Sequence, residues 1–150
     1  MSIIEELIQE APDDITFDIE KQDGSAVRFS LHSPSKISLK KKAIEDSIKH
    51  YSRIARIAVN PQETSEASKT HREFAEKLGM NTTEGLKELA SQELWESAVF
   101  VSTALIEPAV TVYEAAHLVI KREDIIARIG KELENRTKQG NSLYNDLKNE

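Results

Sequence analysis

The side chains best suited to chemistry in this sequence are its four histidines and a few adjacent pairs of carboxylates. The histidines, His32, His50, His71 and His117, are widely separated along the chain. A metal site needs several ligands that converge on one point, and zinc sites place them at short characteristic spacings. No such spacing occurs among these histidines, so the sequence predicts no histidine-based metal centre.

Two histidines fall within predicted helices. Glu114 and His117 stand three residues apart, a spacing that binds metal in helical bundles when other helices supply further carboxylates. The acids available elsewhere are typical of a solvated surface, so we interpret the pair as structural. His71 lies on the apolar side of its helix, with no histidine or carboxylate four residues away. We expect a packed or partly exposed structural residue there.

The paired acids, Asp13-Asp14 and Glu123-Asp124, are the remaining candidates for acid–base catalysis. Adjacent acids near a helix start commonly interact with the helix dipole instead. The sequence also lacks cysteine, phosphate-binding glycine loops and the HExxH metalloprotease pattern. We therefore predict no active site, no cofactor and no metal, and we expect a protein of interaction or assembly.

Charge is unevenly distributed in this acidic chain of net charge −6. Residues 1–24 carry eight acids and one base, whereas residues 36–58 carry seven bases and two acids. An acidic chain is a poor general binder of nucleic acid. The basic stretch indicates either a solvated face, an acidic partner, or an intramolecular contact with the acidic N-terminus.

No apolar run approaches the ~20 residues that span a bilayer, and the first residues lack the basic flank of a secretory signal. We therefore expect no membrane contact and a cytoplasmic location. A chain of 150 residues is long enough to bury a core without disulfides or metals.

The N-terminal part predicts a short helix and a β-hairpin. Ser2 and Glu5 have capping-box spacing, and Pro12 would close the helix that they begin. Apolar residues alternate with polar ones in residues 15–31, on both sides of Asp23-Gly24, which is a strong hairpin pattern.

The rest of the chain predicts about five helices. Ser38 caps the first, Gly79 ends the second, and Thr111 with Glu114 forms a capping box before the fourth. The expected helices span residues 38–59, 65–78, 83–106, 111–120 and 123–138. The fold class is thus mainly α with a minor β component, organised as an N-terminal helix and hairpin (1–35), a helical domain (36–138) and a flexible tail (139–150).

The C-terminal half resembles a known family. The features that carry the likeness lie between Glu93 and Arg136: the apolar helix Val99–Ile106, the joint Glu107-Pro108, Thr111-Val112, and the sequence Ile125-Ile126-Ala127-Arg128-Ile129. This order is similar to the C-terminal part of the tail assembly chaperones of long-tailed bacteriophages. These chaperones also tend to begin with a short β element, which residues 15–31 would match.

The resemblance implies a non-catalytic chaperone that binds the tape-measure protein, keeps its apolar helices soluble and helps to recruit tail-tube subunits. Such a protein would act in the host cytoplasm and be absent from the mature virion. It also implies possible homo-oligomers, for which the hairpin edge is a plausible contact.

A client-binding surface must be apolar and able to accept amphipathic helices. Two predicted helices have more apolar surface than one packing face needs, so we expect the partner-binding residues there: Ile54, Ile57, Trp95, Val99 and Ile106. A large aromatic at helical spacing is also typical of a core, and that interpretation of Trp95 stays open.

Two other functions fit the same residues. A structural virion protein, such as a head-tail connector or tail-completion protein, would remain in purified particles, whereas a chaperone would not. A bacterial regulatory or adaptor domain would be encoded away from tail-tube and tape-measure genes.

Overall fold

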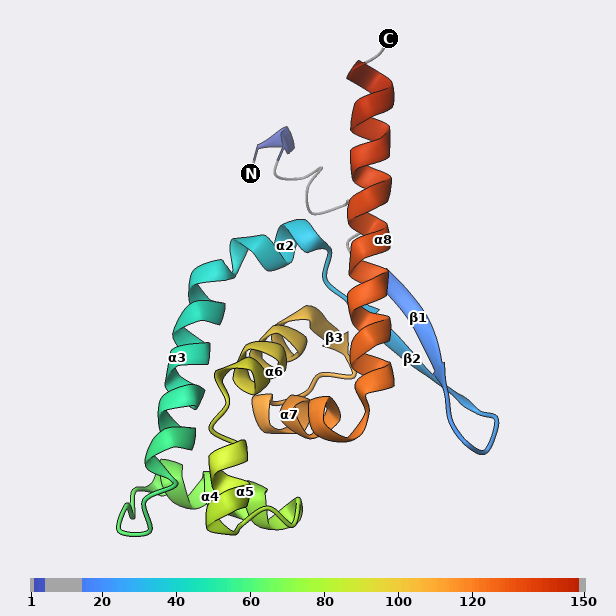
Figure 1. Cartoon of the computed structure of the whole chain (residues 1–150). Coiled ribbons are helices and arrows are strands. Elements are labelled where there is room, and N and C mark those ends of the chain that lie inside the picture. Colours follow the sequence, from blue (N-terminus) through green and yellow to red (C-terminus); the bar gives the residue numbers. More distant parts are fainter. Residues whose placement is uncertain (1, 5–14, 149–150) are drawn as a thin grey trace.

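The computed structural model describes residues 2–4 and 15–148, with side chains to residue 137. Figure 1 shows a helical body with a small sheet on one side and a long C-terminal helix that extends past the body. The elements are β1 (Ile15–Glu20), β2 (Ala26–Leu31), α2 (Pro34–Leu39), α3 (Lys41–Ile57), α4 (Glu66–Lys77), α5 (Thr83–Glu88), α6 (Gln92–Ala104), β3 (Leu105–Glu107), α7 (Val112–Lys121) and α8 (Glu123–Lys148). The fold is mainly α with a minor β component, as expected. The predicted helix between Ser2 and Pro12 falls mostly outside the described residues.

The hairpin is confirmed. β1 and β2 pair antiparallel in register, from Ile15 opposite Leu31 to Glu20 opposite Ala26. Gly24 takes a positive φ of 87°, which favours glycine. The Asp23 carboxylate accepts hydrogen bonds from the backbone N–H and hydroxyl of Ser25, and these bonds lower the pKa of Asp23.

A third strand, β3, completes the sheet on the other side of β2. Ser30 lies opposite Glu107 and Leu31 opposite Leu105, with a register shift between them. We predicted helix through Ile106, so this is a correction. Pro108 disfavours helical backbone at the residue before it, and the chain turns into an extended strand that pairs with β2 instead.

The helix predicted for residues 38–59 is in fact two helices, α2 and α3, and α2 begins earlier than we predicted. Ser33, rather than Ser38, caps α2, since its hydroxyl accepts a hydrogen bond from the backbone N–H of Lys36. Pro34 follows in the first turn, where its missing N–H costs nothing. The Ser38 hydroxyl donates to the carbonyl of Pro34 within that helix. Ser33-Pro34 therefore begins a helix.

The connection from α3 to α4 is held by Arg72. Its guanidinium donates hydrogen bonds to the carbonyls of Ala58, Asn60 and Glu63. We predicted a loop here, and a loop precedes α4, which begins close to the predicted start with Ser65 as its N-cap. The arginine contacts fix this loop against α4 through the carbonyl of the α3 C-cap, Ala58, and the carbonyls of two loop residues.

The predicted central helix is broken into α5 and α6. The indole Nε1–H of buried Trp95 donates to the carbonyl oxygen of Leu89 at 2.7 Å. In a continuous helix that carbonyl would accept from the backbone four residues later. A buried indole N–H needs a partner. We infer that this competition favours the break between Glu88 and Gln92 that the apolar periodicity did not indicate.

The C-terminal helices follow the prediction at their starts but not at the end. The Thr111–Glu114 capping box is present in full, and α7 gives way to α8 between Lys121 and Glu123. We expected Gly140 to end the last helix, and this was wrong: α8 continues to Lys148. A glycine inside a helix costs only about 1 kcal/mol relative to alanine, which a long helix can tolerate.

One core joins the sheet to the helices. The inner faces of the hairpin and of α6 and α8 contribute to the same buried cluster, which includes Phe17, Phe29, Leu31, Trp95, Ala98, Val101, Ile125, Ile129 and Leu133. Arg128 of α8 also lies over the Phe17 ring, 5.0 Å from its centroid. The hairpin and the helical region therefore pack as one body, and the proposed boundary at residue 35 falls inside α2.

His71 sits inside an aromatic cluster with Tyr51, Phe74, Trp95 and Tyr113. Its ring is fully buried, and its Nδ1 lies 3.2 Å from the Tyr113 hydroxyl, with which it shares a hydrogen bond. Its Nε2 is buried with no hydrogen-bond partner among the described residues. Burial lowers the pKa of His71 from 6.5 to about 4, and the nearby positive charge of Arg72 acts in the same direction. The expected structural role of His71 fits this position.

We predict that Trp95→Phe lowers the free energy of unfolding by about 2–4 kcal/mol, because it leaves the Leu89 carbonyl without its partner and removes buried volume. Urea denaturation measures this. Phe100→Leu is the control, since it removes ring atoms at a partly exposed position of the same helix and is expected to cost less than about 1 kcal/mol. Equal losses in the two variants would contradict the role of the indole bond.

We predict that His71 makes the protein less stable in mild acid. The native ring stays neutral down to a pKa of about 4, whereas the unfolded ring takes up a proton near pH 6.5. The unfolded state therefore binds more protons between these values, and stability falls by up to about 3 kcal/mol as pH drops from 6.5 to 4. His71→Phe should flatten this decrease in denaturation curves, whereas His50→Phe, at an exposed position, should not. An unchanged slope in His71→Phe would refute the assignment.

Candidate partner-binding groove

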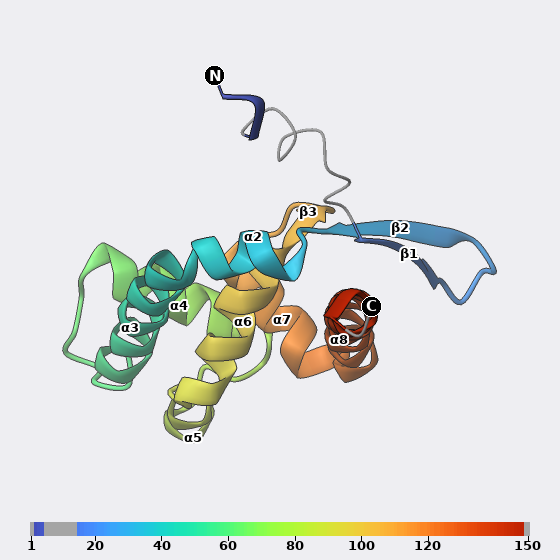
Figure 2. The same cartoon turned by 90° about the horizontal axis from the view of Figure 1, so that it is seen from above.

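α6 runs between α3 and α8 (Figure 2). A groove lies among the side chains of these three helices. Its volume is about 450 Å³, and its lining is mainly apolar. The side chains that form it come from all three helices: Ile44 and Ile48 of α3; Glu96, Ser97, Phe100 and Val101 of α6; and Ile126, Ile129 and Gly130 of α8. α6 thus forms the floor, and α3 and α8 form the two walls.

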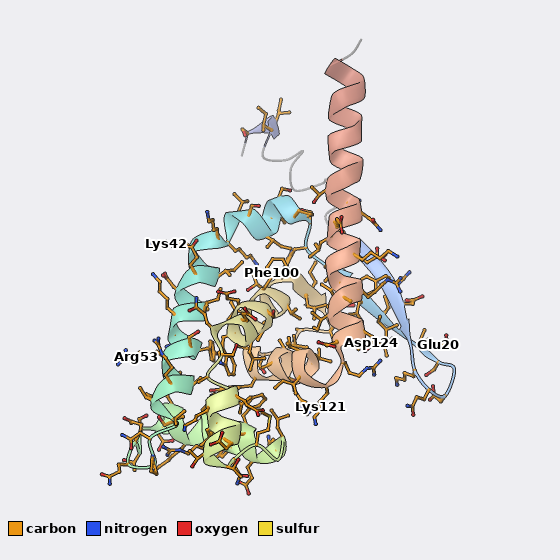
Figure 3. All side chains as sticks on the ribbon, viewed as in Figure 1. Glu20, Lys42, Arg53, Phe100, Lys121 and Asp124 are labelled. Atoms are coloured by element: carbon orange, nitrogen blue, oxygen red, sulfur yellow. The ribbon has the colours of Figure 1, made fainter. Side chains whose placement is uncertain are left out.

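A second recess continues the groove toward α2. It is lined by Pro34, Ile37 and Ser38 of α2, by Leu133, Glu134 and Thr137 of α8, and again by Phe100. Phe100, which is labelled in Figure 3, therefore belongs to both hollows. We name the two hollows together the α3–α6–α8 groove. Its centre is a phenylalanine that is 37% exposed.

Phe100 lies on the polar side of α6. It follows Glu93 by seven residues, Glu96 by four and Ser97 by three, so these positions share one helical face. The sequence analysis missed this residue, although a large aromatic among polar residues of a helix is the pattern that indicates an exposed contact site.

The rim of the groove carries opposite charges at different places. Lys41 precedes Ile44 by three residues and Ile48 by seven, so it lies on the groove side of α3 near the α2–α3 junction. Lys42 and Arg53 instead point away from α6 (Figure 3). On the floor, the Glu96 carboxylate accepts a hydrogen bond from Gln92. Charged side chains of both signs thus lie near the groove, and Glu134 adds an acidic side chain to the recess next to α2.

The residues predicted to bind a partner lie elsewhere, and most are inaccessible. Ile54, Trp95 and Val99 are buried, with Trp95 fully so. α7 packs along α6, and the Tyr113 ring meets the Trp95 ring edge-on at 5.7 Å between centroids. The surplus apolar stripe of α6 is therefore used inside the chain. Ile57 and Ile106 are half-buried, and Ile106 belongs to β3.

A separate hollow of about 620 Å³ lies between the hairpin and α7. Ile19, Val27 and Leu118 contribute apolar surface to it, and His117 and Glu114 also line it. The Glu114 carboxylate accepts the hydrogen bond from the Thr111 backbone N–H that closes the capping box, and this bond lowers its pKa. The glutamate of the Glu114–His117 pair is thus engaged in capping α7.

Within the ranges 2–4 and 15–137, no three histidine or acidic side chains come close enough together to hold a metal ion. Among the helices described, none combines the length and apolarity needed to cross a bilayer.

The chain was compared with known proteins by sequence and by structure. No protein-family model matches it, and no curated protein or solved structure matches it significantly.

Proposed function

We propose that this protein is a tail assembly chaperone of a long-tailed bacteriophage. In this role it binds an amphipathic helix of the tape-measure protein, keeps that protein soluble in the host cytoplasm, and promotes assembly of the tail tube. The proposal needs no catalytic group. It takes its family from the resemblance of residues 93–136 and its binding surface from the α3–α6–α8 groove.

The observation that carries the proposal is the apolar groove with Phe100 exposed at its centre. Apolar side chains buried at an interface contribute about 25 cal/mol per Å² removed from water. Ile44, Ile48, Ile126 and Phe100 are all only partly covered by the chain itself, so a partner gains by covering them. Grooves between helices accept the apolar face of a further helix, with contacts at every third or fourth residue.

This surface replaces the one predicted from sequence. On its Trp95 side, the apolar surface of α6 is buried against α7 and the sheet. On the opposite side, Phe100 remains accessible to a partner. Isoleucines of α3 and α8 contribute to both walls, and the groove is formed by the folded chain alone. A preformed site avoids much of the ordering entropy that binding otherwise costs.

We predict that co-expression with the tape-measure protein raises the soluble fraction of that protein and that the two co-purify. Phe100→Asp should abolish both effects, because it places an unpaired charge in the apolar contact. The matched control is Leu39→Asp, which changes an apolar helical residue that is 86% exposed and lies outside the groove lining. Circular dichroism checks that each variant is folded.

No gain in solubility with the wild-type chain would remove the chaperone proposal. Detection of the chain in purified phage particles would instead support a structural virion protein. Equal loss in the two aspartate variants would locate the contact outside the groove.

A further inference from the structure

β1 is an edge strand. The sheet has the order β1-β2-β3, so β1 pairs with β2 on one side and with no described strand on the other. Figure 1 shows β1 on the outer side of the hairpin, with no described element beyond it. The edge of a sheet presents backbone N–H and C=O groups to its surroundings. A partner at this edge must therefore be able to bond backbone groups.

The register identifies which backbone groups face outward. At the end of the hairpin, the backbone N–H of Lys21 donates to the carbonyl of Ser25 at 2.7 Å. Hydrogen-bonded and non-hydrogen-bonded pairs alternate along an antiparallel ladder. Since β1 and β2 pair without a shift from Ile15 to Glu20, every second residue of β1 bonds β2 and the others face away from it. The outward-facing residues are Thr16, Asp18 and Glu20.

These outward-facing groups are unpaired in the folded chain. No hydrogen bond joins the backbone N–H or C=O of Thr16, Asp18 or Glu20 to a described residue. All of them are exposed, whereas the alternate residues Ile15 and Phe17 are buried. An extended strand can pair with such a row, because its own donors and acceptors repeat with the same spacing. A helix cannot, since it has already paired its backbone groups internally.

The charge beside this edge determines which strand fits. Asp18 and Glu20 are both exposed acids. Arg28 of β2 lies 3.8 Å from Asp18, in an exposed pair that contributes little, and Glu20 is in no ion pair with a described residue. A second copy that paired antiparallel about Asp18 would place two Asp18 carboxylates opposite each other, which is destabilising. Opposite charges across strands are favourable instead.

We propose that β1 accepts an extended strand of another protein, with lysine or arginine opposite Asp18 and Glu20, so that the sheet gains a strand outside β1. Backbone hydrogen bonds to the outward-facing residues hold this strand, and the two carboxylates select a basic sequence. The inference goes beyond the proposed function and does not depend on it, because no residue of β1 lines the α3–α6–α8 groove.

Amide hydrogen exchange of the full chain, followed by NMR, tests the proposal. The probe is a capped peptide of about six residues, the usual length of a strand, in which lysine alternates with valine. In the free chain the amides of Thr16, Asp18 and Glu20 should exchange fast, and those of Phe17 and Ile19 slowly. With the peptide at about ten times its dissociation constant, exchange of the outward-facing amides should slow by about tenfold.

A second peptide isolates the backbone contribution. It has the same sequence, but methyl groups replace the hydrogens of the backbone N–H groups that would face β1. It keeps every lysine and should give no protection. Equal protection by the two peptides, or none by either, would show that β1 does not accept a strand. Protection in the free chain that increases with protein concentration would identify a second copy as the occupant and also overturn the proposal.

Two substitutions at Asp18 separate the backbone contact from the charge. Asp18→Pro removes an N–H that β2 does not use, so the hairpin should persist while the peptide no longer protects Thr16 and Glu20. Asp18→Asn is the matched control, since it keeps the N–H and should weaken peptide binding only about two- to fivefold. Slow exchange at Ile19 checks that the hairpin remains. Full protection in a folded Asp18→Pro variant would refute the proposed pairing.

Discussion

The hydrogen bond from the Trp95 indole to the Leu89 carbonyl is the interaction on which the arrangement of this protein depends. It accompanies the break that separates α5 from α6 and allows the single tryptophan of the chain to lie fully buried. Tyr113 packs edge-on against its indole ring, and the Tyr51 ring stacks on it. The Trp95 side chain therefore links α3, α6 and α7. The orientation of α6 at this contact determines which face of α6 remains uncovered.

The groove follows from this constraint. α6 is apolar on more than one side, and α7 and the aromatic cluster bury the side that carries Trp95. The opposite side keeps Phe100, and α3 and α8 bring isoleucines to either edge of it. The Arg72 contacts hold the end of α3 through three backbone carbonyls, so the α3 wall is tied to α4 as well as to α6. The aromatic cluster and the Arg72 hydrogen bonds thus hold in place the helices that form the proposed binding surface.

The sequence predicted what local rules control. Asp23-Gly24 with alternating apolar residues identified the hairpin, and the Thr111–Glu114 pair identified the start of α7. It failed where a specific partner decides the local structure: the Trp95 indole binds a carbonyl six residues earlier at the break in the central helix, and β3 forms because Glu107 pairs with the distant Ser30. The groove was not predicted from the sequence for a similar reason. Apolar periodicity shows which faces of a helix are apolar, but it does not show which of these faces another helix covers. Phe100, placed among polar residues, was the one local indication of it.

The pairing of β2 with β3 has a consequence for synthesis of the chain. β2 leaves the ribosome long before Leu105–Glu107 are translated, and a two-stranded hairpin is at best marginally stable alone. Until α6 has been made, the inner edge of β2 is open to other strands, which is a route to aggregation of nascent chains. β3 follows α6 directly in the chain. The strand that completes the sheet is therefore translated immediately after the helix that forms the floor of the groove. Truncated products that stop before it would expose an unpaired strand, so this fold can be completed only late in translation.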